Sequence, residues 1–478
     1  MSLASRNSPR HEPIIRSPRI DQAILHTITR LVLHEPALNK WFTYSNLQTM
    51  VFAYQPEEVM PALQDVERLV NAEHLTAAGF VSYEAASGFD SALSTQSETQ
   101  LPLVCFGLFA QVTECEPPPP LAKPAAPPWQ LDTEHQDYLA DIAEIRDLIA
   151  AGEVYQINHT LRLHNTVAEP WQHFCQIAVD APYAAFIETD EFAIVSASPE
   201  LFFRLQGNDL QSRPMKGTET RRVDPWADKR ISDWLKASQK NRAENLMITD
   251  MVRNDLGKIA VPGSIDVSGL FKVEEYPTVW QMTSTVHART DANLVEIFRT
   301  LFPAASITGA PKRAAMKHIE RLENSPRGVY TGAIGYFAPN RQAQFSVAIR
   351  TSAVDKLTGT ARYGAGGGIV WDSTAVQEYF EVLAKTKILG AVTAQTGIEL
   401  FETLRWTPGE GFSRLNRHLQ RMRRSAEFFG VPMNFSCAHG ALDQAIAGDP
   451  DRCLRVRLSI DMQGDFRVEC RELPERLS

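Results

Sequence analysis

A lysine in a polar turn is the residue of this sequence with the clearest capacity for covalent chemistry. Lys216 lies in the stretch 213–221, directly before Gly217 and Thr218, after a run that alternates like a strand. A lysine amine without its proton is a nucleophile, and desolvation or a nearby cation favours that state. A turn lysine between proline and glycine is also common on protein surfaces, so its role depends on the rest of the chain.

Carboxylates on two predicted helices form a second candidate site. Glu378, Glu381 and Lys385 recur at i, i+3 and i+7, which places them on one helix face, and Glu244 lies on another helix. Carboxylate oxygens without a nearby Cys or His pattern suit a hard cation such as Mg²⁺. A solvated helix face with a Glu–Lys pair has the same spacing, so the spacing alone leaves both interpretations open.

A glycine-rich run and an arginine indicate where an anionic ligand would bind. Residues 364–368 read Gly-Ala-Gly-Gly-Gly, and their backbone N–H groups are able to bind an anion. The run lacks the glycine spacing of nucleotide-binding loops, and glycines also serve close contacts between packed strands. Arg350, at the end of the preceding strand, has a guanidinium suited to bidentate pairing with a carboxylate.

The composition bounds the class of protein. A chain of 478 residues with 44% hydrophobic and 22% charged residues has material for several domains and a large core. The net charge of -9 argues against a nucleic-acid partner, and no apolar run is long enough for a membrane span. The six cysteines are scattered without a C-x-x-C pair, and residues 1–19 have no apolar leader segment. These features predict a cytoplasmic enzyme.

The pattern of elements predicts the α+β class with a large, mostly antiparallel sheet system, because strands and helices come in groups. We predict helices at residues 21–33, 56–72, 133–151, 226–252, 294–301, 310–322 and 373–389. We predict strands at residues 75–83, 101–112, 155–163, 184–188, 192–196, 200–205, 332–337, 345–351 and 359–364.

Proline and polar segments suggest the division of the chain. Residues 1–20 read as a disordered tail. Residues 21–128 form an N-terminal part that ends in a proline-rich connector at 114–128. We interpret the connector as a crossing loop within one large body, with a hinge between independent domains as the alternative. Residues 129–390 form the catalytic domain, and residues 391–478 form a separate segment.

Several ordered blocks carry a family resemblance. They are residues 196–202 (SASPELF), 214–218 (PMKGT), 242–247 (RAENLM), 250–257 (DMVRNDLG), 302–312 (FPAASITGAPK), 330–332 (YTG), 363–368 (YGAGGG) and, nearer the N-terminus, 82–86 (SYEAA). With these blocks the chain resembles the chorismate-utilising enzymes, which include anthranilate, aminodeoxychorismate, isochorismate and salicylate synthases. The resemblance implies a two-sheet antiparallel β-sandwich flanked by helices.

The resemblance also implies roles for single residues. Glu244 and Glu381 match the family's Mg²⁺ ligands, and Glu378 matches a partner that acts through water. Glu200 matches the general acid that protonates the departing C4 hydroxyl of chorismate, a role that requires a carboxyl kept neutral near pH 7. The positions that match substrate-binding groups are Thr218, Thr308, Tyr330, Arg350, Gly366, Gly367 and Lys385.

Two positions favour the aminodeoxychorismate synthases within the family. Water-adding relatives carry a lysine base where this chain has Gln156, and an amide cannot take a proton from water. Lys216 stands where aminodeoxychorismate synthases carry lysine and anthranilate synthases carry a small apolar residue. The resemblance implies that Lys216 attacks C2 and that ammonia then enters at C4, giving 4-amino-4-deoxychorismate for 4-aminobenzoate and folate synthesis. Gln281 replaces a histidine of many relatives, which leaves the fate of the pyruvyl group open.

The ammonia source is expected to be a second protein. Cys105 and Cys175 lack the glycine-rich surroundings of a glutaminase nucleophile. The resemblance therefore implies a glutamine amidotransferase partner, with free ammonia as a substitute. Two alternatives stay open, namely anthranilate synthase component I and a catalytically silent chorismate-binding subunit.

The C-terminal segment resembles a different family. Residues 401–405 (FETLR) and 417–426 (RHLQRMRRSA) resemble the start of aminodeoxychorismate lyase, a pyridoxal-phosphate enzyme to which some synthases are fused. The resemblance implies a small, truncated α/β segment. The sequence has no lysine after Lys387 to form the Schiff base, so lyase activity is not expected from this chain. A truncated fusion and a degenerate remnant both remain possible interpretations.

Overall fold

The fold is known from a computed structural model. It describes residues 27–473 except residues 98, 123–126, 179, 223, 277–278, 391, 394–398, 430, 432, 448–450 and 462–463. The tail predicted at residues 1–20 lies outside the described residues, as do residues 123–126 of the proline-rich connector.

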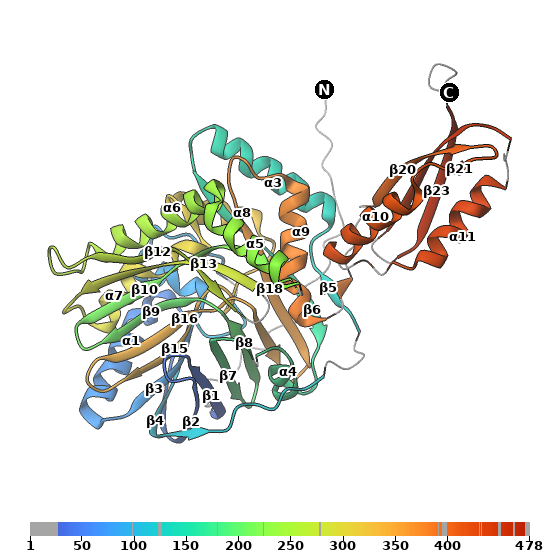
Figure 1. Ribbon diagram of the computed structural model, residues 1–478. Coiled ribbons are helices and arrows are strands. Elements are labelled where there is room, and N and C mark those ends of the chain that lie inside the picture. The colour runs from blue at the N-terminus through green and yellow to red at the C-terminus, as the bar shows by residue number, and fades with distance from the viewer. Residues whose placement is uncertain are drawn as a thin grey trace, which may run out of the picture.

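Strands between residues 28 and 393 form one continuous, 19-stranded sheet that folds over itself into two layers (Figure 1). The first layer runs through β5 (Trp129–Leu131), β6 (Gln156–Thr166), β18 (Thr360–Ile369), β17 (Thr351–Asp355), β8 (Phe192–Ser198), β7 (Tyr183–Thr189) and β1 (Ile28–Glu35). The second layer runs through β2 (Lys40–Ala53), β4 (Val104–Cys115), β3 (Thr76–Val81), β15 (Ala333–Ala338), β16 (Gln342–Val347), β9 (Leu201–Gln206), β10 (Asp209–Arg213) and β13 (Val279–Arg289).

The remaining strands extend this sheet at its ends. Both β11 (Met215–Thr220) and β12 (Asp266–Glu275) pair antiparallel with β13. The short β14 (Gly309–Ala310) pairs antiparallel with β6, and β19 (Val392–Thr393) runs parallel to β5. The antiparallel pairing that dominates this sheet confirms the predicted class.

Helices cover the two outer faces of the layers. An inner core lies between the layers and joins side chains such as Leu31, Phe80 and Ile194. The outer face of the second layer packs on α1 (Pro56–Glu73), α2 (Ala86–Phe89), α6 (Gln239–Leu256) and α7 (Leu294–Leu301). The outer face of the first layer packs on α3 (His135–Ala150), α4 (Pro170–Ile177), α8 (Lys312–Leu322) and α9 (Ala375–Thr386). None of the described helices is long and apolar enough to cross a membrane.

The C-terminal segment forms a smaller body with its own core (Figure 1). Its four-stranded sheet has the order β21 (Gly411–Phe412), β20 (Leu400–Thr407), β22 (Leu454–Ile460) and β23 (Phe466–Glu472). The helices α10 (Leu415–Phe429) and α11 (Phe435–Ile446) supply the other side of this core through residues such as Leu419, Met422 and Leu442.

Two of the predicted helices are wrong. Where the helix at 21–33 was expected, the described residues form β1, whose Leu31 and Leu33 enter one core while Val32 enters another. A strand buried on both faces does not alternate, so its apolar spacing imitated a helix. The helix expected at 226–252 is two helices, because Ser238 is extended (ψ 113°) and its side chain caps the next helix at Asn241. The first of these helices is α5 (Pro225–Ala237).

Candidate active site

Lys216 lies beside a side-chain amide and a glycine from two other strands. A Cβ atom on Gly368 would lie 2.5 Å from Nζ of Lys216 and 2.8 Å from Nε2 of Gln156. A side chain at position 368 would therefore displace the Lys216 amine and the Gln156 amide, so the glycine leaves room for both groups. Gln156 is fully buried, and neither of its side-chain polar atoms hydrogen-bonds to another described group. Buried polar atoms rarely stay unpaired, so this amide is ready for a small polar ligand.

The predicted turn at Lys216 is wrong, because Lys216 lies in β11, whose pairing with β13 shifts register between Met215 and Thr218. Gln281 of β13 fixes this irregular part of the strand. Nε2 of Gln281 donates to the carbonyl of Gly217 at 2.9 Å, and the hydroxyl of Thr218 donates to Oε1 of Gln281 at 2.6 Å. Gly217 has φ +92°, a conformation that favours glycine. The hydroxyl of Thr218, which was predicted to bind substrate, therefore binds the neighbouring strand in this structure. Gln281 thus holds the backbone directly after Lys216.

Glu200 lies in the connection from β8 to β9 and is buried, with 4% of its surface exposed. Its Oε1 accepts a hydrogen bond of 2.7 Å from the hydroxyl of Ser306. Burial raises the pKa of Glu200 to about 7, although the Ser306 hydrogen bond and the charge of Lys216 lower it. A carboxyl with this pKa exchanges protons at neutral pH, as a general acid must. The predicted acid thus lies within the field of the predicted nucleophile.

The predicted carboxylates of α9 gather against the glycine run. A Cβ atom on Gly367 would lie 3.3 Å from Oε2 of Glu378 and 3.7 Å from Oε1 of Glu381. Lys385 binds Oε1 of Glu381 at 2.9 Å and donates to the carbonyl of Gly366 at 2.6 Å. The Lys385 charge lowers the pKa of Glu381 to about 2, whereas burial raises the pKa of Glu378, and the Glu381 charge adds to that rise.

The third predicted metal ligand, Glu244, comes from α6. Its neighbour Asn245 is buried and accepts a hydrogen bond from the hydroxyl of Ser284, which anchors the helix on β13. Nζ of Lys240 lies 4.0 Å from Oε1 of Glu244. The charge of Lys240 also makes a lowering contribution to the pKa of Glu378 and of Glu381 on α9. The ammonium of Lys240 therefore lies near all three predicted ligands.

These carboxylates fit a hard divalent cation in their chemistry, since all their donor atoms are oxygens. Within the described part of the chain, no three acidic, histidine or cysteine side chains lie close enough to form a complete ligand set. An ion at this place would therefore complete its shell with oxygens of substrate or water.

The other predicted substrate-binding residues lie around β18. The ring of Tyr330 packs against Gly364, where a Cβ atom would lie 2.2 Å from the ring. The hydroxyl of Thr308 donates to the carbonyl of Ala304 at 3.2 Å, so in this structure it fixes a turn. Arg350 is half-buried in a left-handed conformation (φ 51°), and its charge lowers the pKa of Tyr363, which burial raises. The glycines of β18 thus let several of the predicted groups converge.

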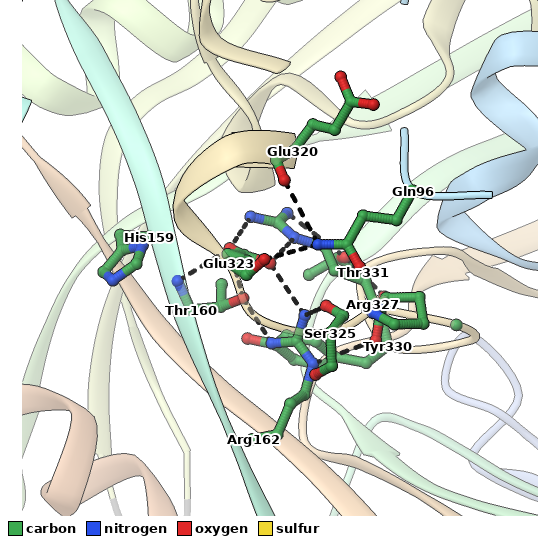
Figure 2. Close-up of polar contacts among 12 residues, drawn as sticks. Gln96, His159, Thr160, Arg162, Glu320, Glu323, Ser325, Arg327, Tyr330 and Thr331 are labelled. Atoms are coloured by element: carbon green, nitrogen blue, oxygen red, sulfur yellow. Dashed lines mark hydrogen bonds and ion pairs between the residues drawn. The ribbon is translucent and has the colours of Figure 1, made fainter. Parts of the chain in front are cut away.

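A buried ionic cluster lies behind Tyr330 (Figure 2). The carboxylate of Glu323 pairs with Arg162 at 2.9 Å and with Arg327 at 2.7 Å, and all three side chains are buried. Arg162 lies over the ring of Tyr330, and Arg327 donates to the carbonyl of Ile307 at 2.7 Å. The cluster therefore ties the turn next to Thr308 to the wall that holds Tyr330.

Glu323→Gln is expected to destabilise the fold by about 3 to 5 kcal/mol, because it leaves two buried guanidinium groups with one carboxylate fewer. Although burial alone raises it, Arg327 and Arg162 lower the pKa of Glu323 to about 2. The stabilisation is therefore present above the ordinary glutamate pKa and is lost as the pH falls through about 2. Urea denaturation measures the change, with Glu320→Gln on the exposed face of α8, the helix that ends just before Glu323, as control. Equal stability of the two variants would contradict the expectation.

Some site residues were not foreseen. Ser306 belongs to the block 302–312, but nothing in its type indicated that it would contact Glu200. Lys240 lies four residues before Glu244, a spacing that places both on one helix face and was available as a signal. Ser373, whose hydroxyl donates to Glu378 at 2.6 Å, lies in a loop whose path depends on the fold.

Comparison with protein families divides the chain in two. Residues 30–390 match the model for chorismate binding enzymes, and residues 399–476 match the model for class IV amino-transferases. Among curated proteins, aminodeoxychorismate synthase component 1 of Klebsiella aerogenes is 42% identical over 262 residues, or 54% of this chain and 58% of that protein. The protein of the same name from Bacillus subtilis is 35% identical over 296 residues, or 61% of each chain. The chain thus spans less than two thirds of the length of these relatives.

Solved structures share the fold. Anthranilate synthase component I from Streptococcus pneumoniae matches with a TM-score of 0.60 and 22% identity, over 80% of this chain and 95% of that one. The menaquinone-specific isochorismate synthase of Escherichia coli matches with a TM-score of 0.60 and 18% identity, over 77% of this chain and 90% of that one. At these identities the matches show the architecture, and they confirm the predicted fold.

Proposed function

The chain belongs to the chorismate-binding enzyme family, and we propose that it converts chorismate and ammonia into 4-amino-4-deoxychorismate. One observation carries the proposal: a lysine amine and an unpaired glutamine amide meet at Gly368, within the field of a buried acid. An amine is a nucleophile, whereas the glutamine cannot activate water. The names of the similar curated proteins support the same reaction.

The reaction we propose uses Lys216 and Glu200 together. The neutral amine of Lys216 forms a bond to C2 while the C4–O bond breaks, and Glu200 gives its proton to the departing hydroxyl, which leaves as water. Ammonia then forms a bond at C4, and the bond between C2 and Lys216 breaks. The enolpyruvyl group stays on the ring throughout. Gln281 keeps the amine in place by fixing β11 at Gly217 and Thr218.

The residues around β18 would hold the substrate's two carboxylates. We assign this role to Arg350, Lys385, Tyr330 and the backbone of Gly366 and Gly367. The two glycines lie on β18, Lys385 lies on α9, and the ring of Tyr330 packs against Gly364 of β18. Glu381 and Glu244 would bind Mg²⁺, with Glu378 as a partner through water. The bound ion would neutralise the ring carboxylate and hold it in place.

The ammonia would come from a glutamine amidotransferase partner, since "component 1" in the names of the relatives implies a further component. We place the reaction in the cytoplasm, because the six cysteines are free and two of them are buried as thiols.

Identification of the product tests the proposal. The protein is incubated with chorismate, MgCl₂ and an ammonium salt. The products are separated, and their masses are determined by mass spectrometry. The expected product contains nitrogen and retains the pyruvyl carbons. Fluorescent anthranilate would assign the chain to the anthranilate synthases, and isochorismate would contradict the role given to Gln156. Absence of turnover would leave only a chorismate-binding subunit.

A further inference from the structure

Glu200 lines a small cavity. It has a volume of about 20 Å³ and is lined by Ser212, Asp255, Ser306 and Glu200, among others. This volume is enough for one water molecule. The acid is therefore bordered by hydroxyl groups and by a space that cannot admit substrate.

Of the described serine hydroxyls around this acid, only that of Ser306 contacts its carboxyl. Ser306 is buried and donates to Oε1 of Glu200 at 2.7 Å. The hydroxyl of Ser198 donates to the carbonyl of Val347 at 2.6 Å, and that of Ser212 donates to the carbonyl of Phe202 at 2.7 Å. These two serines stabilise strands, whereas Ser306 acts on the acid itself.

Besides the Ser306 hydroxyl, a backbone group also interacts with the carboxyl of Glu200. The backbone N–H of Met215 acts to lower the pKa of Glu200, and Met215 directly precedes Lys216 on β11. The acid is thus fixed between the strand that carries the nucleophile and the 3₁₀ turn Ala305–Ile307 that carries Ser306. A carboxyl held from two sides keeps one orientation, which proton transfer to a single leaving atom requires.

The charges around Glu200 are few. The charge of Lys216 acts to lower the pKa of Glu200. Burial raises the pKa of Tyr276, and the nearby charge of Glu200 adds to that rise. Asp255, which also lines the cavity, is paired with Lys258 at 2.7 Å and with Lys312 at 3.2 Å. The Asp255 charge is therefore compensated, and the Ser306 hydroxyl is the main neutral group that sets the state of the acid.

We propose that Ser306 is the positioning residue of the general acid. By donating to Oε1, it disfavours protonation of that oxygen, so that the transferable proton resides on Oε2 and the carboxyl keeps one orientation. This inference rests on the acid role given to Glu200 under the proposed function.

Ser306→Ala tests the inference through the pH dependence of turnover. Loss of the donor removes a group that stabilises the ionised form, so the alkaline limb of kcat should move to higher pH by about one unit. Loss of orientation should lower the plateau of kcat about tenfold, with KM for chorismate unchanged. Ser212→Ala, in the same cavity but bonded to a carbonyl, should change neither quantity. Ser306→Thr, which keeps the hydroxyl, should restore the pH limb.

The outcomes separate this inference from the proposed function. If Glu200→Gln loses activity while Ser306→Ala keeps the wild-type kcat and pH limb, the positioning role is wrong and the acid stands. If Glu200→Gln is fully active, the acid assignment itself fails. Should Ser306→Ala not fold by circular dichroism, Ser306→Cys replaces it, because a thiol is of similar size and a weak donor. A wild-type limb in Ser306→Cys would then overturn the inference.

Discussion

Lys216→Ala is expected to lower the rate of aminodeoxychorismate formation by at least about 10³-fold, the loss that follows removal of a covalent nucleophile. The amine of Lys216 lies at Gly368, and its charge acts to lower the pKa values of both Glu200 and Glu381. Alanine at this position leaves ammonia to attack without covalent help. The measurement is initial rate with chorismate, Mg²⁺ and saturating ammonium, by product mass.

Two comparisons make the Lys216 result specific. Lys216→Arg keeps a positive charge near Glu200 and Glu381 but cannot attack carbon, so it should be as inactive as the alanine variant. Lys229→Ala, on the exposed surface of α5, should behave as the wild type. Chorismate without ammonia should add mass to the peptide that contains Lys216. Full activity of Lys216→Ala would exclude the covalent route.

The motif residues of this site could be predicted from sequence, but their arrangement could not. Lys216, Gln156 and Gly368 lie on three strands whose proximity depends on the pairing of β6 with β18 and on the position of β11. Each of these residues lies at a position that matches the family's sequence blocks, so a role could be predicted for each one separately. Ser306 and Glu200 are 106 residues apart in the sequence, and a local sequence pattern cannot predict a contact over such a separation.

The errors in the fold also have a physical cause. The two faces of β1 pack into two different cores, so Leu31, Val32 and Leu33 are all buried. The sequence of β1 therefore lacks the alternation of apolar and polar residues that marks a strand. Pairing with β2 and with β7 decides the conformation, and β7 lies far away in sequence. By contrast α3, α7 and α8 were predicted because their amphipathic pattern and end signals are local.

Glu381→Gln is expected to weaken Mg²⁺ binding and to lower turnover by about 10²- to 10³-fold, because one anionic oxygen donor is lost and Lys385 loses its partner. Glu378→Gln should cost less, about 10- to 100-fold, since that carboxylate accepts from Ser373 and acts through water. Isothermal titration with MgCl₂ in the presence of chorismate measures binding apart from turnover. Chelation of the metal should abolish activity in the wild type, and added Mg²⁺ should restore it.

The Mg²⁺ dependence of the Glu381→Gln variant distinguishes a metal ligand from a residue with a general electrostatic role. If Glu381 only balances Lys385 and Lys240, its neutral variant should bind Mg²⁺ as the wild type does and should lose activity equally at every Mg²⁺ concentration. If it is a ligand, excess Mg²⁺ should restore part of the turnover. Asp372→Asn is the matched control, because it also removes one negative charge and Asp372 is exposed in the loop before α9. This variant should leave Mg²⁺ binding and turnover unchanged. Equal losses in Glu378→Gln and Glu381→Gln would contradict the assigned division between ligand and partner.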